Sequence, residues 1–432
     1  MASVDFEVAT EAKSPASPKR SARLEDARAD RERLNMKRGA WHQFGDKSQK
    51  LIKEQLELGN GVGVILSPSN LHFKHVKDRS QQYRDLGAQT ILDTQFFDPE
   101  FENKHLRTFE LTPFRQSVTA LCQISDQDLG RLSNRLEQLN RELGTSALLA
   151  PAVAYEAGRA EIIDLNTKLF NAAKAAGDMV GIPTYSTILL SSSAIATEAL
   201  GNEALSHATS LSASGCYYAV ELDDQERIPT DPSLVNRIAG LGLTLSCTGL
   251  PVLHAYAGLT GLISVAVGAD AAAFGHNHNL RYFSTSRFEP RPDQPRKAPP
   301  PPRYLSGPLW GTIVYPDETT LMSSMWEEIR TASPFSPNRP NEPLGTWEAN
   351  RHYLYVLSRE LTNLCASSSA IACANSAIQK LSTAIELHAR IARTGLVVND
   401  KANAHQAVWR DAIQALITSR RPDYDYLTML GK

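Results

Sequence analysis

Short apolar runs that end in polar residues recur along the chain, and each is followed by a segment with helical spacing. In the clearest example, two apolar runs without alternation, Val252 to Tyr256 and Asp270 to Gly275, flank the short apolar segment Leu259 to Val267. Runs of this kind are typical of parallel strands that are covered on both faces. A parallel pair needs a crossover connection, and the middle segment predicts the helix that supplies it.

The same order of apolar run, polar end and helix also precedes this region. The earlier runs that predict strands are 62–66, 90–92, 147–154, 184–190 and 216–222. This rhythm predicts an α/β fold, a (β/α)8 TIM-like barrel, with residues Tyr304 to Val314 as the eighth strand. An open doubly wound sheet is the alternative. It normally has a Gly-rich phosphate turn after its first strand, whereas here the first run ends in Ser67-Pro68-Ser69-Asn70.

Composition divides the chain into three parts. Residues 1–40 mix both charges with Ser, Ala and Pro, and predict a flexible arm or one that orders on a partner. Residues 41–330 hold the barrel, interrupted by the proline-rich stretch 288–303, which we expect to be an exposed extended loop. Residues 331–432 begin with a second proline-rich loop and continue as a helical appendage of two to four helices. The proline-rich loops and these helices are the expected contacts for a protein partner.

Charge and cysteine content narrow the class of protein. A net charge of -2 over 432 residues gives no global attraction to nucleic acid or to an anionic membrane. Binding of nucleic acid would therefore need a local basic groove. The five scattered cysteines lack zinc-type spacing, and we expect free thiols, no metal and no cofactor. The N-terminus lacks the apolar core of a signal peptide, and no apolar run reaches about 20 residues. The sequence therefore predicts a cytoplasmic protein without membrane contact.

In a barrel the carboxyl ends of all strands meet at one mouth, so the polar residues that follow the strands should converge. Carboxylates follow at least three of the predicted strands. Two carboxylates in one cleft can take different pKa values and serve as acid and base, or as nucleophile and base. For any one of them, a structural ion pair with an arginine is the alternative. The predicted catalytic residues are Asp93, Glu221, Asp223 and His276.

The remaining polar residues at the predicted strand ends are candidates for ligand binding. Arg281, with the backbone amides around Gly258 to Gly261, predicts an anion site at a helix start, although these glycines can equally serve tight turns. His276 and His278 are two residues apart and would point to opposite sides, which favours one functional histidine over a metal site. The predicted ligand-binding residues are Ser67, Asn70, Gln95, Glu156, His254, Tyr256, His278 and Arg281.

Two of these stretches resemble a known family. Gly87 to Phe97 (GAQTILDTQFF) and Gly268 to Phe274 (GADAAAF) are similar to segments of the tRNA-guanine transglycosylases and their DNA-modifying relatives. That family is a TIM barrel that exchanges a guanine base through a covalent aspartate, so the resemblance implies a nucleobase-type substrate. The family's cysteine zinc motif is missing here, and Ala271 to Ala273 occupy the region of its nucleophile. Either another carboxylate, such as Asp93 or Glu221, has taken over this role, or catalysis has been lost.

We therefore predict a polar pocket at the mouth of an intracellular barrel, acting on a small nucleobase- or nucleotide-type substrate by transfer or hydrolysis at a glycosidic bond. The alternative is a non-catalytic barrel that serves as a scaffold in a larger, nucleic-acid-associated assembly. Converging carboxylates and a histidine in a pocket would favour the enzyme. A mouth plugged by Phe96, Phe97 or the loop 287–303 would favour the scaffold.

Overall fold

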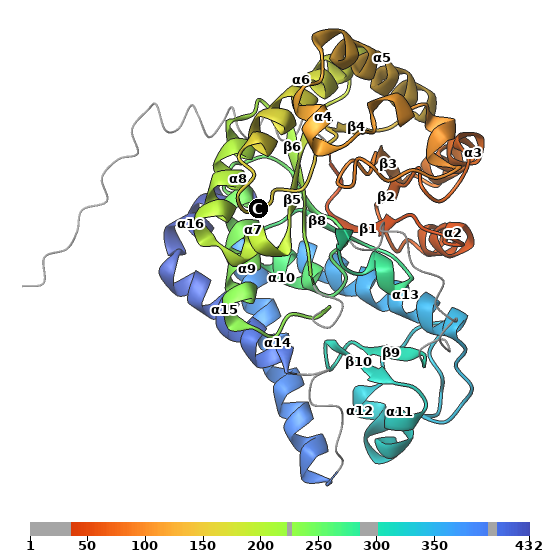
Figure 1. Ribbon diagram of the computed structural model, residues 1–432. Helices are drawn as coiled ribbons and strands as arrows, with labels where there is room; N and C mark the ends of the chain where they lie inside the picture. Colours follow the sequence, from red (N-terminus) through yellow and green to blue (C-terminus); the bar gives the residue numbers. More distant parts are fainter. Residues whose placement is uncertain (1–35, 223–226, 286–300, 396–403) are drawn as a thin grey trace, which may run out of the picture.

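The computed structural model describes residues 36–222, 227–285, 301–395 and 404–432. Within them, parallel strands form a closed barrel in chain order, and β1 completes the ring by pairing with both β2 and β8. The predicted (β/α)8 barrel is therefore confirmed (Figure 1). Its strands are β1 (Gly39–Gln43), β2 (Gly63–Leu66), β3 (Gln89–Leu92), β4 (Ala147–Leu149), β5 (Thr184–Leu190), β6 (Gly215–Val220), β7 (Val252–His254) and β8 (Ala271–Phe274).

Helices between the strands cover the outside of the barrel, and local signals in the sequence set their ends. Ser125 caps one of them by accepting the N–H of Asp128, and Gly144 ends the same helix in the left-handed conformation. Asp231 caps another, directly before a proline in its first turn. These helices are α2 (Gln49–Glu57), α3 (Phe73–Asp85), α4 (Val118–Cys122), α5 (Asp126–Leu143), α6 (Glu161–Val180), α7 (Ser192–Ala196), α8 (Glu198–Ser210), α9 (Pro232–Ser246) and α10 (Thr260–Ala266), with 3-10 turns η1 (Leu106–Phe109), η2 (Thr112–Phe114) and η3 (His278–Leu280).

Alternation along each strand separates two cores. Side chains such as Trp41, Ile91 and Leu253 point into the barrel and form one buried cluster. Their neighbours in sequence, such as Ala40 and Leu92, point outward and pack with the surrounding helices. Because both faces are buried, most strand residues are apolar on both faces, which is why the sequence shows no alternation of polar and apolar residues.

The prediction for the eighth strand is wrong. Residues Tyr304 to Val314 lie outside the barrel as an antiparallel hairpin of β9 (Arg303–Ser306) and β10 (Gly311–Val314). The two halves are joined by a tight turn, and a connection this short allows only antiparallel pairing. The hairpin packs with α11 (Asp317–Leu321), η5 (Ser323–Met325) and α12 (Trp326–Ile329) around a small core of its own. The place in the barrel belongs to β1, which the sequence reading did not assign as a strand.

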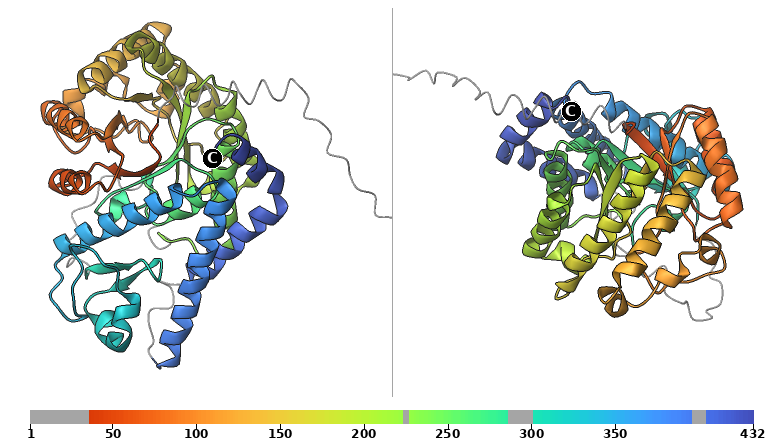
Figure 2. Two further views of the ribbon diagram at one scale, coloured as in Figure 1. Left: turned by 180° about the vertical axis from the view of Figure 1, so that it is seen from behind. Right: turned by 90° about the horizontal axis from the view of Figure 1, so that it is seen from above.

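The C-terminal part of the described chain is helical, as predicted, with α13 (Thr346–Cys365), α14 (Ala370–Arg393), α15 (His405–Ser419) and α16 (Arg421–Met429). Figure 2 shows these helices along one side of the barrel, with the hairpin beyond them. The helix α13 packs against β1, β9 and α10, and α15 packs against α9. The outward side chains of β8 are covered by α10 and, at Phe274, by Tyr353 of α13, whose ring meets that of Phe274 edge to face.

Some predictions fall outside the described residues. They concern the arm up to residue 35, most of the proline-rich stretch 288–303, and Asp223. Among the described helices, none is both long enough and apolar enough to cross a membrane.

Candidate functional site at the barrel mouth

The carboxylate of Asp93, the first residue after β3, is the meeting point of three distant segments. Its Oδ2 accepts hydrogen bonds of 2.9 Å from the hydroxyls of Tyr217 and Tyr256, and its Oδ1 accepts the N–H of Gln95 at 2.9 Å. Tyr217 reaches it from inside β6, and Tyr256 from just beyond β7. Asp93 is only 6% exposed. The structure thus places one predicted catalytic carboxylate in the centre of the mouth, held by phenol hydroxyls.

An aromatic cluster closes this region. The ring of Phe97 meets the ring of Phe283 edge to face, with centroids 5.1 Å apart, and lies 6.3 Å from the ring of Tyr256. The rings of Tyr256 and Phe283 are 5.8 Å apart. All three side chains are at most 6% exposed. The mouth beside Asp93 is therefore filled by aromatic side chains, one of which, Phe97, was the plug considered from the sequence.

A buried arginine fixes the loop that carries Asp93 and Phe97. The guanidinium of Arg115 donates to the carbonyls of Thr94 and Gln95 at 2.6 and 2.9 Å, and it lies 5.0 Å from the ring centre of Phe96. It also donates to two further carbonyls of this loop. Burial lowers the pKa of Arg115 to about 10, against the opposing effect of nearby carboxylates, so the guanidinium stays charged at neutral pH. Sequence reasoning missed this residue because a single arginine between helices carries no pattern.

Three predicted ligand-binding residues gather beside Asp93. Asn70 donates from its side-chain nitrogen to the hydroxyl of Ser67 at 2.7 Å. The N–H of Ser69 donates to Oε1 of Gln95 at 3.3 Å, which links the ends of β2 and β3. Gln95 has a positive φ of 56°, a strained conformation for this residue type that the surrounding contacts hold in place. Ser67, Asn70 and Gln95 therefore form one polar rim segment next to Asp93.

Glu221 is held by other partners. Its Oε1 accepts from the N–H and the hydroxyl of Thr285, at 2.8 and 2.6 Å, and its Oε2 accepts the N–H of Ser192 at 3.1 Å. These bonds tie the segment after β8 to the first turn of α7. Glu156 forms a half-exposed ion pair with Arg159 at 3.6 Å, the structural alternative considered for it. Each of these carboxylates thus has a local structural partner.

His254 points away from the mouth, so its predicted place there is wrong. Its Nδ1 lies 2.7 Å from the hydroxyl of Ser264 on α10, and its ring stacks on Tyr218 with centroids 4.4 Å apart. The reason is alternation, because Leu253 faces the barrel interior and its neighbour must face the helices. Burial lowers the pKa of His254 to about 3, which keeps the ring neutral.

His276 and Arg281 lie on the side of the mouth nearest α13. Arg281 stacks on Tyr353 with its guanidinium carbon 3.5 Å from the ring centre, and donates to Asn350 at 3.0 Å and to the carbonyl of His276. Burial, and then the charge of Arg281, lower the pKa of His276 to about 4. Arg281 therefore anchors α13 to the barrel, a role that the sequence did not suggest. His278 begins η3, and its side chain lies outside the described part.

The glycines near Arg281 have a packing role. A Cβ on Gly258 would lie 2.2 Å from the carbonyl oxygen of Arg281, and φ of Gly258 is +49°. Only glycine fits this close approach of two backbone segments. The helix that follows, α10, has seven residues and packs against α13 and α14. These observations favour the turn interpretation of the glycines over an anion site.

The aspartate that carries the family resemblance lies at the opposite end of the barrel. Asp270 precedes β8, where its Oδ2 pairs with the ammonium of Lys432 at 2.9 Å and accepts the N–H of Val252 at 3.0 Å. Ala271 and Ala273 point into the barrel as part of its apolar filling. Within the described residues, no group of three or more His, Cys, Asp or Glu side chains is placed to hold a metal ion.

Comparison with known proteins assigns no family to this chain. No family model and no curated protein matches it. Among solved structures, a glycerol uptake operon antiterminator-related protein from Thermotoga maritima is 10% identical, with 55% of this chain and 95% of that chain covered and a TM-score of 0.30. A GH3-family glycosyl hydrolase from Mycobacterium smegmatis is 12% identical, with 58% and 85% covered and a TM-score of 0.35. A proposed lyase/mutase from Burkholderia cenocepacia is 12% identical, with 59% and 81% covered and a TM-score of 0.34.

Proposed function

We propose that the mouth of the barrel binds the base of a nucleoside- or nucleotide-type ligand, with Asp93 as the carboxylate that recognises it. The observation that carries this proposal is the contact of Asp93 with two phenol hydroxyls inside a cluster of aromatic rings. A carboxylate among aromatic rings offers a planar ligand both a hydrogen-bond acceptor and stacking surfaces.

The chemistry of Asp93 selects a particular edge of a base. An ionised carboxylate only accepts hydrogen bonds, and its two oxygens match two neighbouring N–H donors in one plane. Guanine carries such a pair, a ring N–H beside an exocyclic amino group. In the bound state one donor replaces the hydroxyls of Tyr217 and Tyr256 on Oδ2, and the other binds Oδ1 beside the N–H of Gln95. The base stacks against Phe97 or Phe283, one of which moves aside to admit it.

Of the predicted catalytic carboxylates that lie in the described part of the chain, Asp93 is the one that a reaction at a glycosidic bond would use. Both oxygens of Glu221 already accept hydrogen bonds from Thr285 and Ser192, so a second carboxylate is engaged elsewhere. Acid and base roles shared by two carboxylates are therefore not supported by the contacts of these residues. Recognition of the base is the step that the geometry supports best.

The second candidate is a non-catalytic scaffold, and the closed mouth favours it. Phe97 and Phe283 are buried against each other at the mouth, and Arg115 holds the loop that carries Phe97 in place through backbone carbonyls. A barrel that is filled at this end can still present its C-terminal helices and hairpin to a partner. The two candidates differ in one property, which is whether a base enters beside Asp93.

Calorimetric titration of the full chain with guanosine and with inosine separates them. Inosine lacks the exocyclic amino group, so we expect it to bind at least about 10-fold more weakly, the cost of one hydrogen bond to a charged group. Asp93→Asn should weaken guanosine binding by a similar or larger factor. Glu156→Gln, which changes a half-exposed carboxylate, is the matched control and should bind as the parent does. No binding of guanosine by the parent, or equal binding by Asp93→Asn, would overturn the proposal and favour the scaffold.

A further inference from the structure

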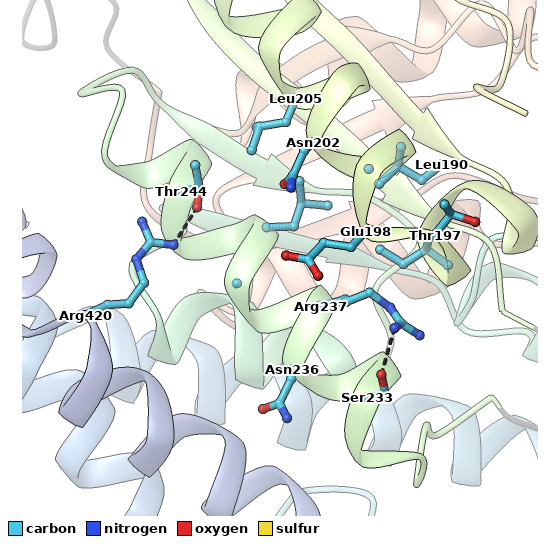
Figure 3. A pocket seen from close by; sticks show the side chains of 14 residues that line it. Leu190, Thr197, Glu198, Asn202, Leu205, Ser233, Asn236, Arg237, Thr244 and Arg420 are labelled. Atoms are coloured by element: carbon cyan, nitrogen blue, oxygen red, sulfur yellow. Dashed lines mark hydrogen bonds between the residues drawn. The ribbon is translucent and has the colours of Figure 1, made fainter. Parts of the chain in front are cut away.

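A groove lies on the side of the barrel between α8 and α9, outside the mouth. It has a volume of about 410 Å³ and ends at Arg420, where α15 passes into α16 (Figure 3). Glycines line both helices, Gly201 on α8 and Gly240 on α9. A Cβ on Gly240 would meet nothing within 4 Å, and one on Gly201 would meet only a carbonyl oxygen at 3.9 Å. The groove is therefore open because side chains are missing from its walls.

The floor and the rim of the groove differ in chemistry. Apolar side chains from β5, α7, α8 and α9 contribute to the lining, namely Leu190, Ile195, Leu205 and Leu241. Of the polar side chains on the rim, Arg420 is already engaged, because it donates to Thr244 and pairs with Asp423.

The two charged residues that remain are Glu198 on α8 and Arg237 on α9. Figure 3 shows both side chains in the groove. Arg237 donates to the hydroxyl of Ser233 at 2.7 Å. Among the described residues, neither Glu198 nor Arg237 forms an ion pair. A negative and a positive group thus border an open, partly apolar space without neutralising each other.

We propose that this groove binds a small zwitterion of the amino-acid type with an apolar side chain. The ammonium group of the ligand pairs with Glu198, its carboxylate pairs with Arg237, and its side chain covers the leucines of the floor. The volume is within the range of small-molecule sites, which is roughly 300–1,000 Å³. The proposal is independent of the mouth, since none of the residues around Asp93 lines the groove.

Calorimetric titration of the full chain with L-phenylalanine and L-leucine tests the charge pattern. Two analogues each lack one charged group, 3-phenylpropionate without the ammonium and phenethylamine without the carboxylate. We expect each analogue to bind at least about 10-fold more weakly than L-phenylalanine, since each loses one charged contact. Glu198→Gln should weaken binding of L-phenylalanine by about the same factor as removal of its ammonium group, and Arg237→Gln by about the same factor as removal of its carboxylate.

A substitution that fills the groove tests its location. Gly240→Leu places a side chain in open space and should abolish binding. Gly130→Leu on α5 is the matched control, because a Cβ added to this helical glycine would also meet nothing within 4 Å, and it should leave binding unchanged. Circular dichroism of both variants checks that they fold. The proposal is overturned if neither amino acid binds at about 10 mM, a concentration well above the ~1 mM dissociation constant of a weak site. Equal binding of all three phenyl compounds, or unchanged binding by folded Gly240→Leu, also overturns it.

Discussion

Asp93 and Asp270 lie at opposite ends of the barrel, and both carboxylates are buried, but their partners differ. Asp270 pairs with the ammonium of Lys432, whose side chain is completely buried, and with the guanidinium of Arg38 at 3.6 Å. Asp93 accepts hydrogen bonds from two phenol hydroxyls. Removing one member of a buried ion pair leaves a charge stranded in a poor solvent, whereas a neutral hydroxyl can be replaced by another donor. The comparison separates a carboxylate that stabilises the fold from one that can exchange partners with a ligand.

The largest effect is expected for Asp270→Asn. The amide keeps the shape of the side chain but leaves the buried ammonium of Lys432 without its counter-charge. We expect a loss of about 3–5 kcal/mol in the free energy of unfolding, the usual range for breaking one side of a buried pair. Urea denaturation followed by circular dichroism measures it. A loss below about 1 kcal/mol, the usual value for an exposed pair, would show that Asp270 is not the structural member of the comparison.

Acid should destabilise the folded chain through the buried side chain of His254. The pKa of His254 is lowered by burial from 6.5 to about 3, so below pH 6.5 the unfolded chain takes up a proton that the folded chain does not. Stability from His254 is therefore present above pH 6.5 and is lost as the pH falls toward 3, by about 1.4 kcal/mol per pH unit. In His254→Gln, the slope of the unfolding free energy against pH should be smaller by up to about 1.4 kcal/mol per pH unit when unfolding is measured between pH 7 and pH 5. An unchanged slope would contradict the buried, neutral state of the ring.

Asp93→Asn should have a smaller effect on stability than Asp270→Asn. The amide oxygen of the new side chain can still accept from Tyr217 and Tyr256, but its nitrogen replaces the oxygen that accepts the N–H of Gln95. We therefore expect a loss of about 1–2 kcal/mol in the free energy of unfolding. The same urea denaturation measures it beside the first variant. If Asp93→Asn cost as much as Asp270→Asn, the carboxylate at the mouth would also be structural, and the distinction between the two ends would disappear.

The smallest effect is expected for Glu156→Gln. This residue lies after β4 and forms an ion pair with Arg159 in which 45% of the Glu156 side chain is exposed. Exposed pairs of this kind contribute about 0–1 kcal/mol, so the unfolding midpoint in urea should shift very little. A clear shift would mean that a rim carboxylate outside the centre of the mouth also contributes strongly to the stability of the fold.

The fold was largely predictable because most of the strands share one sequence pattern. Seven of them read as apolar runs with polar ends, since helices cover their outer faces. The strand Gly39–Gln43 was missed because it reads GAWHQ, in which His42 is buried against the helix layer and is held by a backbone carbonyl. The segment Tyr304 to Val314 was assigned as the eighth strand because it is apolar. Its apolar residues pack in a separate small core outside the barrel.

The site was predictable only where position along a strand decides it. Asp93 follows a strand directly, so its place at the mouth could be inferred. The direction of His254 could not be inferred, because a strand with two buried faces gives no sign of which side chain points inward. Tyr217 and Phe283 were missed since buried aromatic residues look like ordinary core, and only the structure shows that Tyr217 contacts a carboxylate and that Phe283 packs at the mouth.

A crystal structure of the full chain grown with guanosine examines the role of Asp93 most directly. We predict that two N–H groups of the base lie about 2.9 Å from the carboxylate oxygens of Asp93. We also predict that the side chain of Phe97 or Phe283 is displaced from the position it has without ligand. A structure in which Asp93 keeps both hydroxyl contacts, the aromatic rings stay in place and no base lies beside them would contradict this account.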